Sequence, residues 1–173
     1  RFSKGVLTMS ETPPLRIGLG HDTHRIGEGG PMTLGGVSID CDFHLIGHSD
    51  ADVLLHAVTD ALLGAAGLGD IGTLFPNTDS ENENRSSREM LKIAYAKVIA
   101  AGWKITNLDC VIFATKPKIS PYRDAMIRSI RETLNLSDGQ VFVKGKTGEN
   151  VGPVGRCEAI MAECVVLLHQ APG

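Results

Sequence analysis

Histidines and aspartates gather in the first third of the chain. Five of the six histidines lie between residues 21 and 56, and aspartates stand among them. Two segments hold most of them: Gly-His-Asp-Thr-His at residues 20–24, and His-Ser-Asp-Ala-Asp-Val-Leu-Leu-His at residues 48–56. Imidazole and carboxylate together suit a divalent cation of the zinc type. A lone histidine is more often an ordinary surface or core residue, so it is the clustering that indicates a metal site.

The first of these segments is expected to follow a β-strand. Residues 15–20 read Leu-Arg-Ile-Gly-Leu-Gly, with an apolar side chain at every second position, which predicts a short strand ending at glycine. If the backbone stays extended beyond it, Asp22 and His24 project to the same side because they are two residues apart. A hairpin is expected next, over residues 34–41, with its turn at the two adjacent glycines.

The second segment is expected to open a helix. Ser49-x-x-Asp52 fits the capping-box pattern, with aspartate in place of the usual glutamate, so we expect the helix to begin at Ser49. Apolar residues recur at helical spacing from residue 53 to 65. Asp52, His56 and Asp60 follow at four-residue steps beside this apolar face. We expect Asp60, one helical turn beyond His56, to orient or electrostatically support a metal-site histidine without binding the metal; the alternative is an exposed helical aspartate.

The remainder of the chain alternates helix and strand signals. After a glycine-rich loop at residues 67–79, we expect helices at 87–101 and 121–136 and strands at 108–115, 141–144 and 160–168. These elements predict an α/β fold of the α+β type: a two-layer single domain with a mixed β-sheet packed against about three helices. Residues 15–170 would form this catalytic domain, and residues 1–14 a disordered N-terminal lead.

Composition bounds the class of protein. A chain of 173 residues with 42% hydrophobic and 21% charged residues is ordinary for one globular domain. A net charge of −3 gives no basic stripe for nucleic acid, and no apolar run reaches the roughly 18 residues of a membrane span. The four cysteines form no C-x-x-C pair, which favours reduced thiols in the cytoplasm, with a plastid left open.

One segment resembles the end of a phosphate-binding P-loop. Residues 145–147 read Gly-Lys-Thr, but the glycine required five residues earlier is replaced by Gln140. Gly148 and Gly152 also disfavour the long helix that must follow a P-loop. The P-loop interpretation therefore fails, although residues 144–155 could still surround phosphate with exposed backbone N–H groups and a lysine.

Five sequence blocks in order resemble one family. They are the His/Asp segment at 20–24, Gly-His-Ser-Asp-Ala-Asp at 47–52, Asp-Ile-Gly at 70–72, Phe-Pro-Asn-Thr-Asp at 75–79, and residues 144–158. From about residue 16 to 170 the chain resembles the 2-C-methyl-D-erythritol 2,4-cyclodiphosphate synthases of the non-mevalonate isoprenoid pathway. The resemblance implies cyclisation of a cytidine-diphosphate-linked methylerythritol phosphate with release of CMP, in a homotrimer with active sites between subunits.

The resemblance also implies roles for individual residues. It makes Asp22, His24 and His56 the zinc ligands, His48 and Thr147 catalytic, and Glu149 the ligand of a second cation, magnesium or manganese. The implied substrate-binding residues are Asp22, His24, His48, Ser49, Asp70, Ile71, Gly72, Phe75, Pro76, Asn77, Thr78, Asp79, Ala114, Thr115, Lys116, Pro117, Lys118, Ile119, Ser120, Lys146, Thr147, Gly148, Glu149 and Arg156.

This chemistry needs little acid–base machinery. The attacking group would be a phosphate monoester, which with a second pKa of about 6 is largely an anion near neutrality.

Two other readings use the same metal site. A metal-dependent phosphoester hydrolase would need Asp52 or Asp60 as an acid or base, and a binding protein with a structural zinc would need a fourth ligand such as Cys41 or His21.

Overall fold

A computed structural model describes residues 14–47, 49–76, 78 and 85–170 of the chain. The expected N-terminal lead lies outside these ranges except for Pro14, so the division into a lead and one catalytic domain stays a prediction. No helix within the described ranges is long and apolar enough to cross a membrane.

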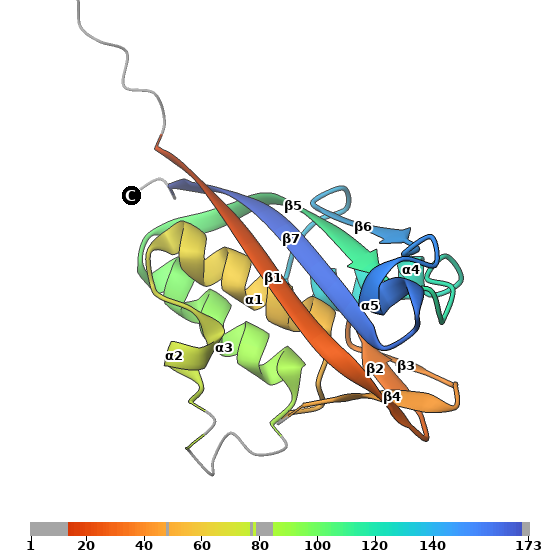
Figure 1. Ribbon diagram of the computed structural model, residues 1–173. Helices are drawn as coiled ribbons and strands as arrows, with labels where there is room; N and C mark the ends of the chain where they lie inside the picture. The colour runs from red at the N-terminus through yellow and green to blue at the C-terminus, as the bar shows by residue number, and fades with distance from the viewer. Residues whose placement is uncertain (1–13, 48, 77, 79–84, 171–173) are drawn as a thin grey trace, which may run out of the picture.

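A five-stranded mixed sheet forms one layer of the molecule (Figure 1). Its strands, in spatial order, are β4 (Phe43–Ile46), β1 (Leu15–Glu28), β7 (Ala159–Gln170), β5 (Trp103–Phe113) and β6 (Val141–Lys146). β5 and β6 are parallel, and the other neighbours are antiparallel. The predicted hairpin is present as β2 (Met32–Leu34) and β3 (Val37–Ile39), which pair with each other.

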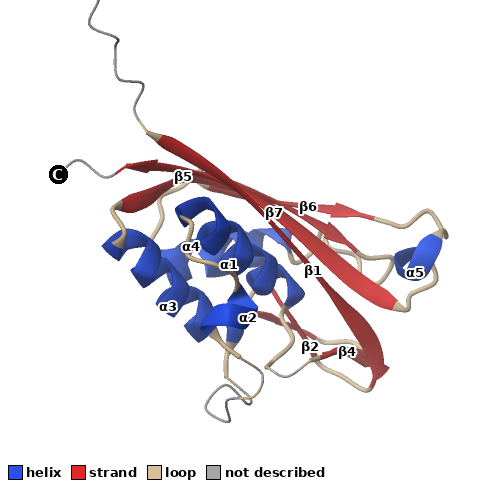
Figure 2. Ribbon diagram, turned by 60° about the vertical axis from the view of Figure 1, so that its left-hand side comes forward, coloured by secondary structure: helices blue, strands red, loops and turns tan. Residues whose placement is uncertain are grey.

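Helices cover one face of this sheet and form the second layer (Figure 2). The long ones are α1 (Val53–Ala66), α3 (Ser87–Ala100) and α4 (Arg123–Leu134), and the short helix α2 (Ile71–Leu74) lies with them. The short helix α5 (Gly152–Gly155) lies apart from this layer. The expected two-layer fold with a mixed sheet and three main helices is therefore confirmed.

The contact between β1 and α1 sets the geometry on which the site depends. Gly18 and Gly20 of β1 face α1, and a Cβ atom at Gly20 would lie 1.9 Å from the carbonyl oxygen of Ala57. Glycine thus lets the helix backbone lie directly on the strand. Since alternate residues of a strand share a face, Asp22 and His24 also point toward the helix layer.

Several sequence-based boundaries are wrong; β5, for example, begins at Trp103 and not at residue 108. The first strand continues to Glu28, because β7 pairs with β1 from Leu15 to Arg25. The first long helix begins after Asp52, not at Ser49, because the Asp52 carboxylate caps the helix by accepting a hydrogen bond from the N–H of Leu55 at 3.1 Å. The glycine-rich segment is also not all loop, since it contains α2.

Candidate functional site

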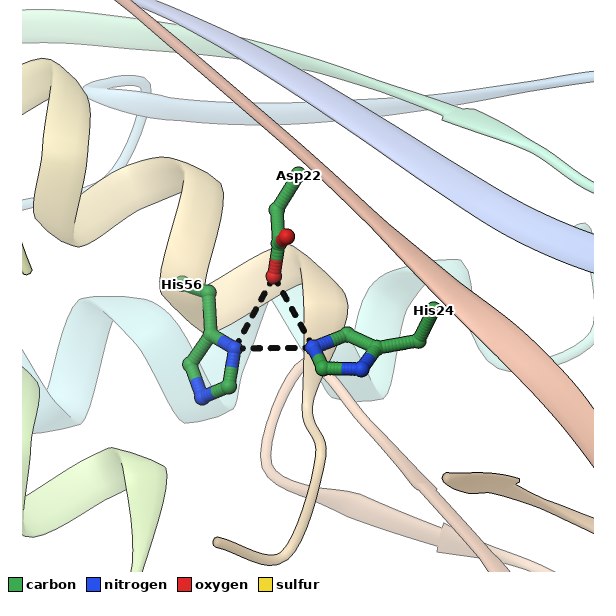
Figure 3. Close-up of side chains that lie close together, drawn as sticks. All are labelled: Asp22, His24 and His56. Carbon is green, nitrogen blue, oxygen red and sulfur yellow. Dashed lines mark hydrogen bonds and ion pairs between the residues drawn. The ribbon is translucent and has the colours of Figure 1, made fainter. Parts of the chain in front are cut away.

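Three ligand atoms meet where β1 passes the N-terminal half of α1 (Figure 3). Asp22 Oδ2 lies 3.0 Å from His24 Nε2 and 2.9 Å from His56 Nδ1. The two ring nitrogens are 3.1 Å apart. Asp22 and His24 come from β1, and His56 comes from the buried helix α1, so the close packing of strand and helix brings the three side chains together.

The histidine His24 has a fixed orientation. Its Nδ1 lies 2.8 Å from the carbonyl oxygen of Ile46 on β4. A carbonyl only accepts, so Nδ1 carries the hydrogen and the neutral ring leaves the Nε2 lone pair directed at the cluster. Burial lowers the pKa of His24, but the hydrogen bond and charge of Asp22 outweigh it and the pKa is raised from 6.5. Burial opposes ionisation of Asp22, yet both histidines hold its pKa well below the usual range.

This donor set fits a divalent metal of the zinc type. Three atoms about 3 Å apart share a point about 2 Å from each, which is the length of Zn–N and Zn–O bonds. Among the described residues the cluster has three members. Neither expected fourth ligand joins it: His21 pairs with Glu163, and the Cys41 thiol contacts the carbonyl of Phe43. Three protein ligands are typical of a catalytic zinc that keeps an open position.

A pocket of about 560 Å³ joins the metal cluster to the Asp-Ile-Gly block. It is lined by Asp22, His24, Ile46, Gly47, Ser49, His56, Ile71, Gly72, Phe75 and Met90. Asp70 caps α2 by accepting from the N–H of Thr73 at 2.7 Å. Hydrogen bonds from the Thr73 side chain, and after it from the Thr73 backbone N–H, lower the pKa of Asp70.

Asp52, which caps α1, and Asp60, within α1, both have structural partners. Both oxygens of the buried Asp52 accept hydrogen bonds, from the N–H groups of Gly35 at 2.8 Å and Gly36 at 2.6 Å. Asp60 Oδ1 accepts from the N–H of Ile71 at 2.7 Å, so this hydrogen bond holds α2. Electrostatic support of a metal-site histidine by Asp60 stays a prediction. Asp52 is buried with both oxygens occupied, so it is not placed to serve as the base that the hydrolase reading requires.

A second pocket, of about 470 Å³, lies at the β6 edge of the sheet. Of the expected substrate-binding residues 114–120, this pocket is lined by Ala114, Thr115, Lys118, Ile119 and Ser120, together with Lys146 and Thr147. Lys116 instead lines a separate cavity with Cys41 and Cys157.

The expected phosphate-binding segment folds into a tight turn. Glu149 and Asn150 both have positive φ angles, of 48° and 61°. The Thr147 hydroxyl donates to Glu149 Oε1 at 2.8 Å, and both side chains are exposed. The short helix α5 follows, rather than the long helix of a P-loop. Within one chain, neither residue lines the pocket of the metal cluster.

Several expected site residues stand apart from both pockets or outside the described ranges. Arg156 is exposed and forms an ion pair with Glu158 at 2.8 Å. Pro76 and Thr78 are exposed beside α2, while His48, Asn77 and Asp79 lie outside the described residues. The roles expected for all of these residues stay predictions.

One polar residue beside the cluster, Ser87, had no signal in the sequence. Ser87, at the start of α3, lies with its Oγ 2.9 Å from His56 Nε2, and it is hydrogen-bonded to Asp50. Ser87 is 31 residues from His56 in the chain, so no local pattern could have paired them.

Known proteins resemble the chain over almost its whole length. The YgbB family model matches residues 15–169. The 2-C-methyl-D-erythritol 2,4-cyclodiphosphate synthase of Chromobacterium violaceum is 55% identical over 156 residues, which are 90% of this chain and 99% of that protein. The enzyme of that name from Rhodopirellula baltica is 52% identical over 164 residues, 94% of this chain and 99% of the relative.

Solved structures share the fold as well. IspF from Plasmodium falciparum, in complex with CDP, superposes with a TM-score of 0.81 at 36% identity, over 94% of this chain and 100% of that one. The bifunctional IspDF of Campylobacter jejuni gives a TM-score of 0.88 at 42% identity, over 92% of this chain and 43% of its own. The resemblance inferred from the sequence blocks is thereby confirmed, and the chain belongs to the YgbB family, with the 2-C-methyl-D-erythritol 2,4-cyclodiphosphate synthases.

Proposed function

We propose that the chain converts 4-diphosphocytidyl-2-C-methyl-D-erythritol 2-phosphate into 2-C-methyl-D-erythritol 2,4-cyclodiphosphate and CMP, as a phosphorus–oxygen lyase of isoprenoid biosynthesis. The observation that carries the proposal is the three-ligand cluster of Asp22, His24 and His56, which opens into the same pocket as Ile71 and Gly72. The four cysteines are free, which fits a reducing compartment such as the cytoplasm.

The residues of this pocket bind and orient the reacting groups. The 2-phosphate is already an anion near neutrality, so the chain needs to align it with the β-phosphate, not to deprotonate it. A zinc ion held by Asp22, His24 and His56 would polarise the attacked phosphoryl group. Asp70 and the backbone at Ile71 and Gly72 would hold the sugar-alcohol hydroxyls, with His48 and Ser49 beside the diphosphate.

The second pocket suits the nucleotide end of the substrate. Residues 114–120 would surround the cytidine, and Lys146 would add positive charge near the phosphates. The Thr147 hydroxyl would donate to a phosphoryl oxygen, and the Glu149 carboxylate would bind magnesium or manganese. Exposure of both side chains leaves them accessible to a ligand.

A homotrimer would unite the two pockets. The Thr147 segment and the metal cluster border different pockets of one chain, so a site that uses both needs a neighbouring copy. The sheet face opposite the helices carries an apolar stripe on β1: Leu15, Ile17 and Leu19 are 52%, 74% and 66% exposed. Exposed apolar patches of this kind are typical of subunit interfaces.

Product analysis tests the proposal. The purified protein is incubated with the cytidine-diphosphate substrate, with and without a chelator, and products are identified by mass spectrometry. We expect equal amounts of CMP and the cyclic diphosphate, and loss of both with chelator. A linear phosphorylated alcohol with an added water would instead identify a hydrolase and contradict the proposal.

A further inference from the structure

Helix α3 begins directly beside the metal cluster. Ser87, its first residue, is 1% exposed, and its Oγ lies 2.9 Å from His56 Nε2, the ring nitrogen that faces away from Asp22 and His24. The same Oγ hydrogen-bonds to Asp50 Oδ1, and the backbone N–H of Ser87 lies 3.2 Å from both oxygens of that carboxylate. Asp50 therefore caps α3 from a distant segment, whereas the local cap residue Ser86 makes no side-chain cap bond.

The hydrogen bonds that link His56, Ser87 and Asp50 all donate in the same direction, from the imidazole toward the carboxylate. A carboxylate only accepts, so the single hydroxyl hydrogen of Ser87 points at Asp50. The lone pairs of Ser87 Oγ then face His56 Nε2, which must be the nitrogen that carries the hydrogen. In the neutral ring this leaves Nδ1 with its lone pair directed at Asp22 and His24, as a metal ligand requires.

We propose that Ser87 is a positioning residue for the metal site, and that Asp50 acts through it. The pair holds the His56 ring in the tautomer and rotation that a metal needs. His24 receives the equivalent support from the backbone carbonyl of Ile46, so each imidazole ligand has one acceptor behind it. The proposal rests on the metal site of the proposed function and assigns its support to α3, a helix that contributes no ligand to the cluster.

Ser49 is the competing partner for the same nitrogen. Its Oγ lies 3.1 Å from His56 Nε2 and also accepts from the N–H of Ala51 at 3.2 Å. Ser87 is closer, more deeply buried and backed by a carboxylate, which polarises its hydroxyl and strengthens it as an acceptor. The expected order of importance for metal affinity is therefore Ser87 before Ser49.

Zinc affinity measured by competition with a chromophoric chelator tests this assignment without the reaction. We expect Ser87→Ala to weaken zinc binding roughly 10- to 100-fold, the usual cost of losing such a partner. Ser86→Ala, in the exposed neighbour, is the matched control and should bind zinc like the unaltered protein. Cobalt substitution adds a spectroscopic measure: the visible bands of the bound ion should shift in Ser87→Ala but not in Ser86→Ala.

A double-variant cycle distinguishes a connected chain from two separate effects. Asp50→Asn should weaken zinc binding less than Ser87→Ala, because an amide still accepts from the hydroxyl but no longer fixes its direction. The double variant should lose no more affinity than Ser87→Ala alone. If Ser87→Ala does not fold, Asp50→Asn carries the test alone, because we expect Asp50→Asn to lose at least threefold in zinc affinity.

Several results would overturn the assignment. Zinc affinity of Ser87→Ala within twofold of the unaltered protein, or a larger loss in Ser49→Ala, would mean that Ser87 does not position the ring. Losses that multiply in the double variant would mean that Asp50 and Ser87 act independently. Failure of the unaltered protein to bind zinc would remove the proposed metal site itself, whereas tight binding that is insensitive to Ser87 and Asp50 would remove this inference alone.

Discussion

The metal end and the nucleotide end of the molecule are built in opposite ways. At the metal end, every ligand comes from a regular element, and both histidines have an additional hydrogen-bond partner from another segment. At the nucleotide end, Thr147 and Glu149 lie in an exposed turn and bond to each other. His24 lies 22 residues from its partner Ile46, and His56 lies 31 residues from its partner Ser87. Thr147 and Glu149, by contrast, are only 2 residues apart.

The contrast indicates how preorganised each half is. Side chains that are buried or partly buried and have several fixed partners lose little freedom when a metal binds, so metal affinity depends on the fold. An exposed turn can rearrange its side chains when phosphate and a cation arrive. Substitutions at the metal end should therefore act on metal content, and those at the nucleotide end on turnover and on the second cation.

The largest effect is expected at His56. Replacing it with alanine removes a metal ligand, which should cost more than the roughly 10- to 100-fold expected for losing a supporting partner. We expect zinc content near zero, turnover below detection and a folded protein by circular dichroism. His169→Ala, at the far end of β7, is the control and should retain zinc. Full zinc occupancy in His56→Ala would contradict the ligand assignment.

At the nucleotide end, Thr147 and Glu149 should give different kinetic signatures. Thr147→Ala should reduce kcat by about 100-fold while weakening CDP binding much less, because the hydroxyl is needed where charge redistributes. Glu149→Gln should raise the magnesium concentration for half-maximal activity by about tenfold with zinc retained.

The matched control for that pair is Glu132→Gln, on the exposed side of α4. It should leave the magnesium titration unchanged. If Glu149→Gln behaves like this control, Glu149 is only a hydrogen-bond partner of Thr147, and the second-cation role is wrong.

The same contrast explains what the sequence could predict. The paired positions of Asp22 and His24 follow from the two-residue repeat of a strand, and the buried face of α1 follows from its helical repeat. The resemblance supplied His56 as their partner. Each of these inferences needs only local spacing or a family motif, and the structure brings the three residues together.

Long-range partners account for what the sequence missed. The start of α1 was misplaced because Asp52, not Ser49, caps the helix. The Asp52 carboxylate is also held by the N–H groups of Gly35 and Gly36, which lie 17 and 16 residues away. Ser49 fits a capping pattern, yet its hydroxyl lies beside His56 instead. Ser87 had no motif at all. Hydrogen bonds between segments that are far apart in the chain produce no local sequence pattern from which they could be predicted.

A smaller, graded effect is expected from pH. The raised pKa of His24 means that protons compete with zinc at a higher pH than for an ordinary histidine. Zinc affinity should fall by about tenfold per pH unit below that pKa, as one proton is displaced. A chelator competition between pH 6 and 8 measures this, and a flat profile would exclude His24 as a ligand that must lose a proton.

The metal-free protein should show the opposite trend. A raised histidine pKa stabilises the fold below the unfolded value of 6.5, and this contribution is lost as the pH rises through the folded value. The lowered pKa of Asp22 contributes above 3.8 and is lost on acidification. The ion pair should therefore stabilise the metal-free protein most between pH 4 and 6.5, as measured by Tm.

The smallest effect is expected at Asp60, which lies at the metal end but supports a pocket wall instead of a ligand. Burial, and after it the charges of Asp70 and Asp22, raise the pKa of Asp60, while the hydrogen bond from Ile71 opposes the shift. Because a raised carboxyl pKa means that ionisation costs stability at neutral pH, Asp60→Asn should leave Tm unchanged or slightly higher. The amide oxygen can still accept from Ile71.

Asp60→Ala should lose that hydrogen bond, at a cost of about 1 kcal/mol, and raise KM through a displaced α2. Equal zinc affinity in both variants would support this role, whereas a large loss of zinc in Asp60→Asn would make its charge part of the metal site.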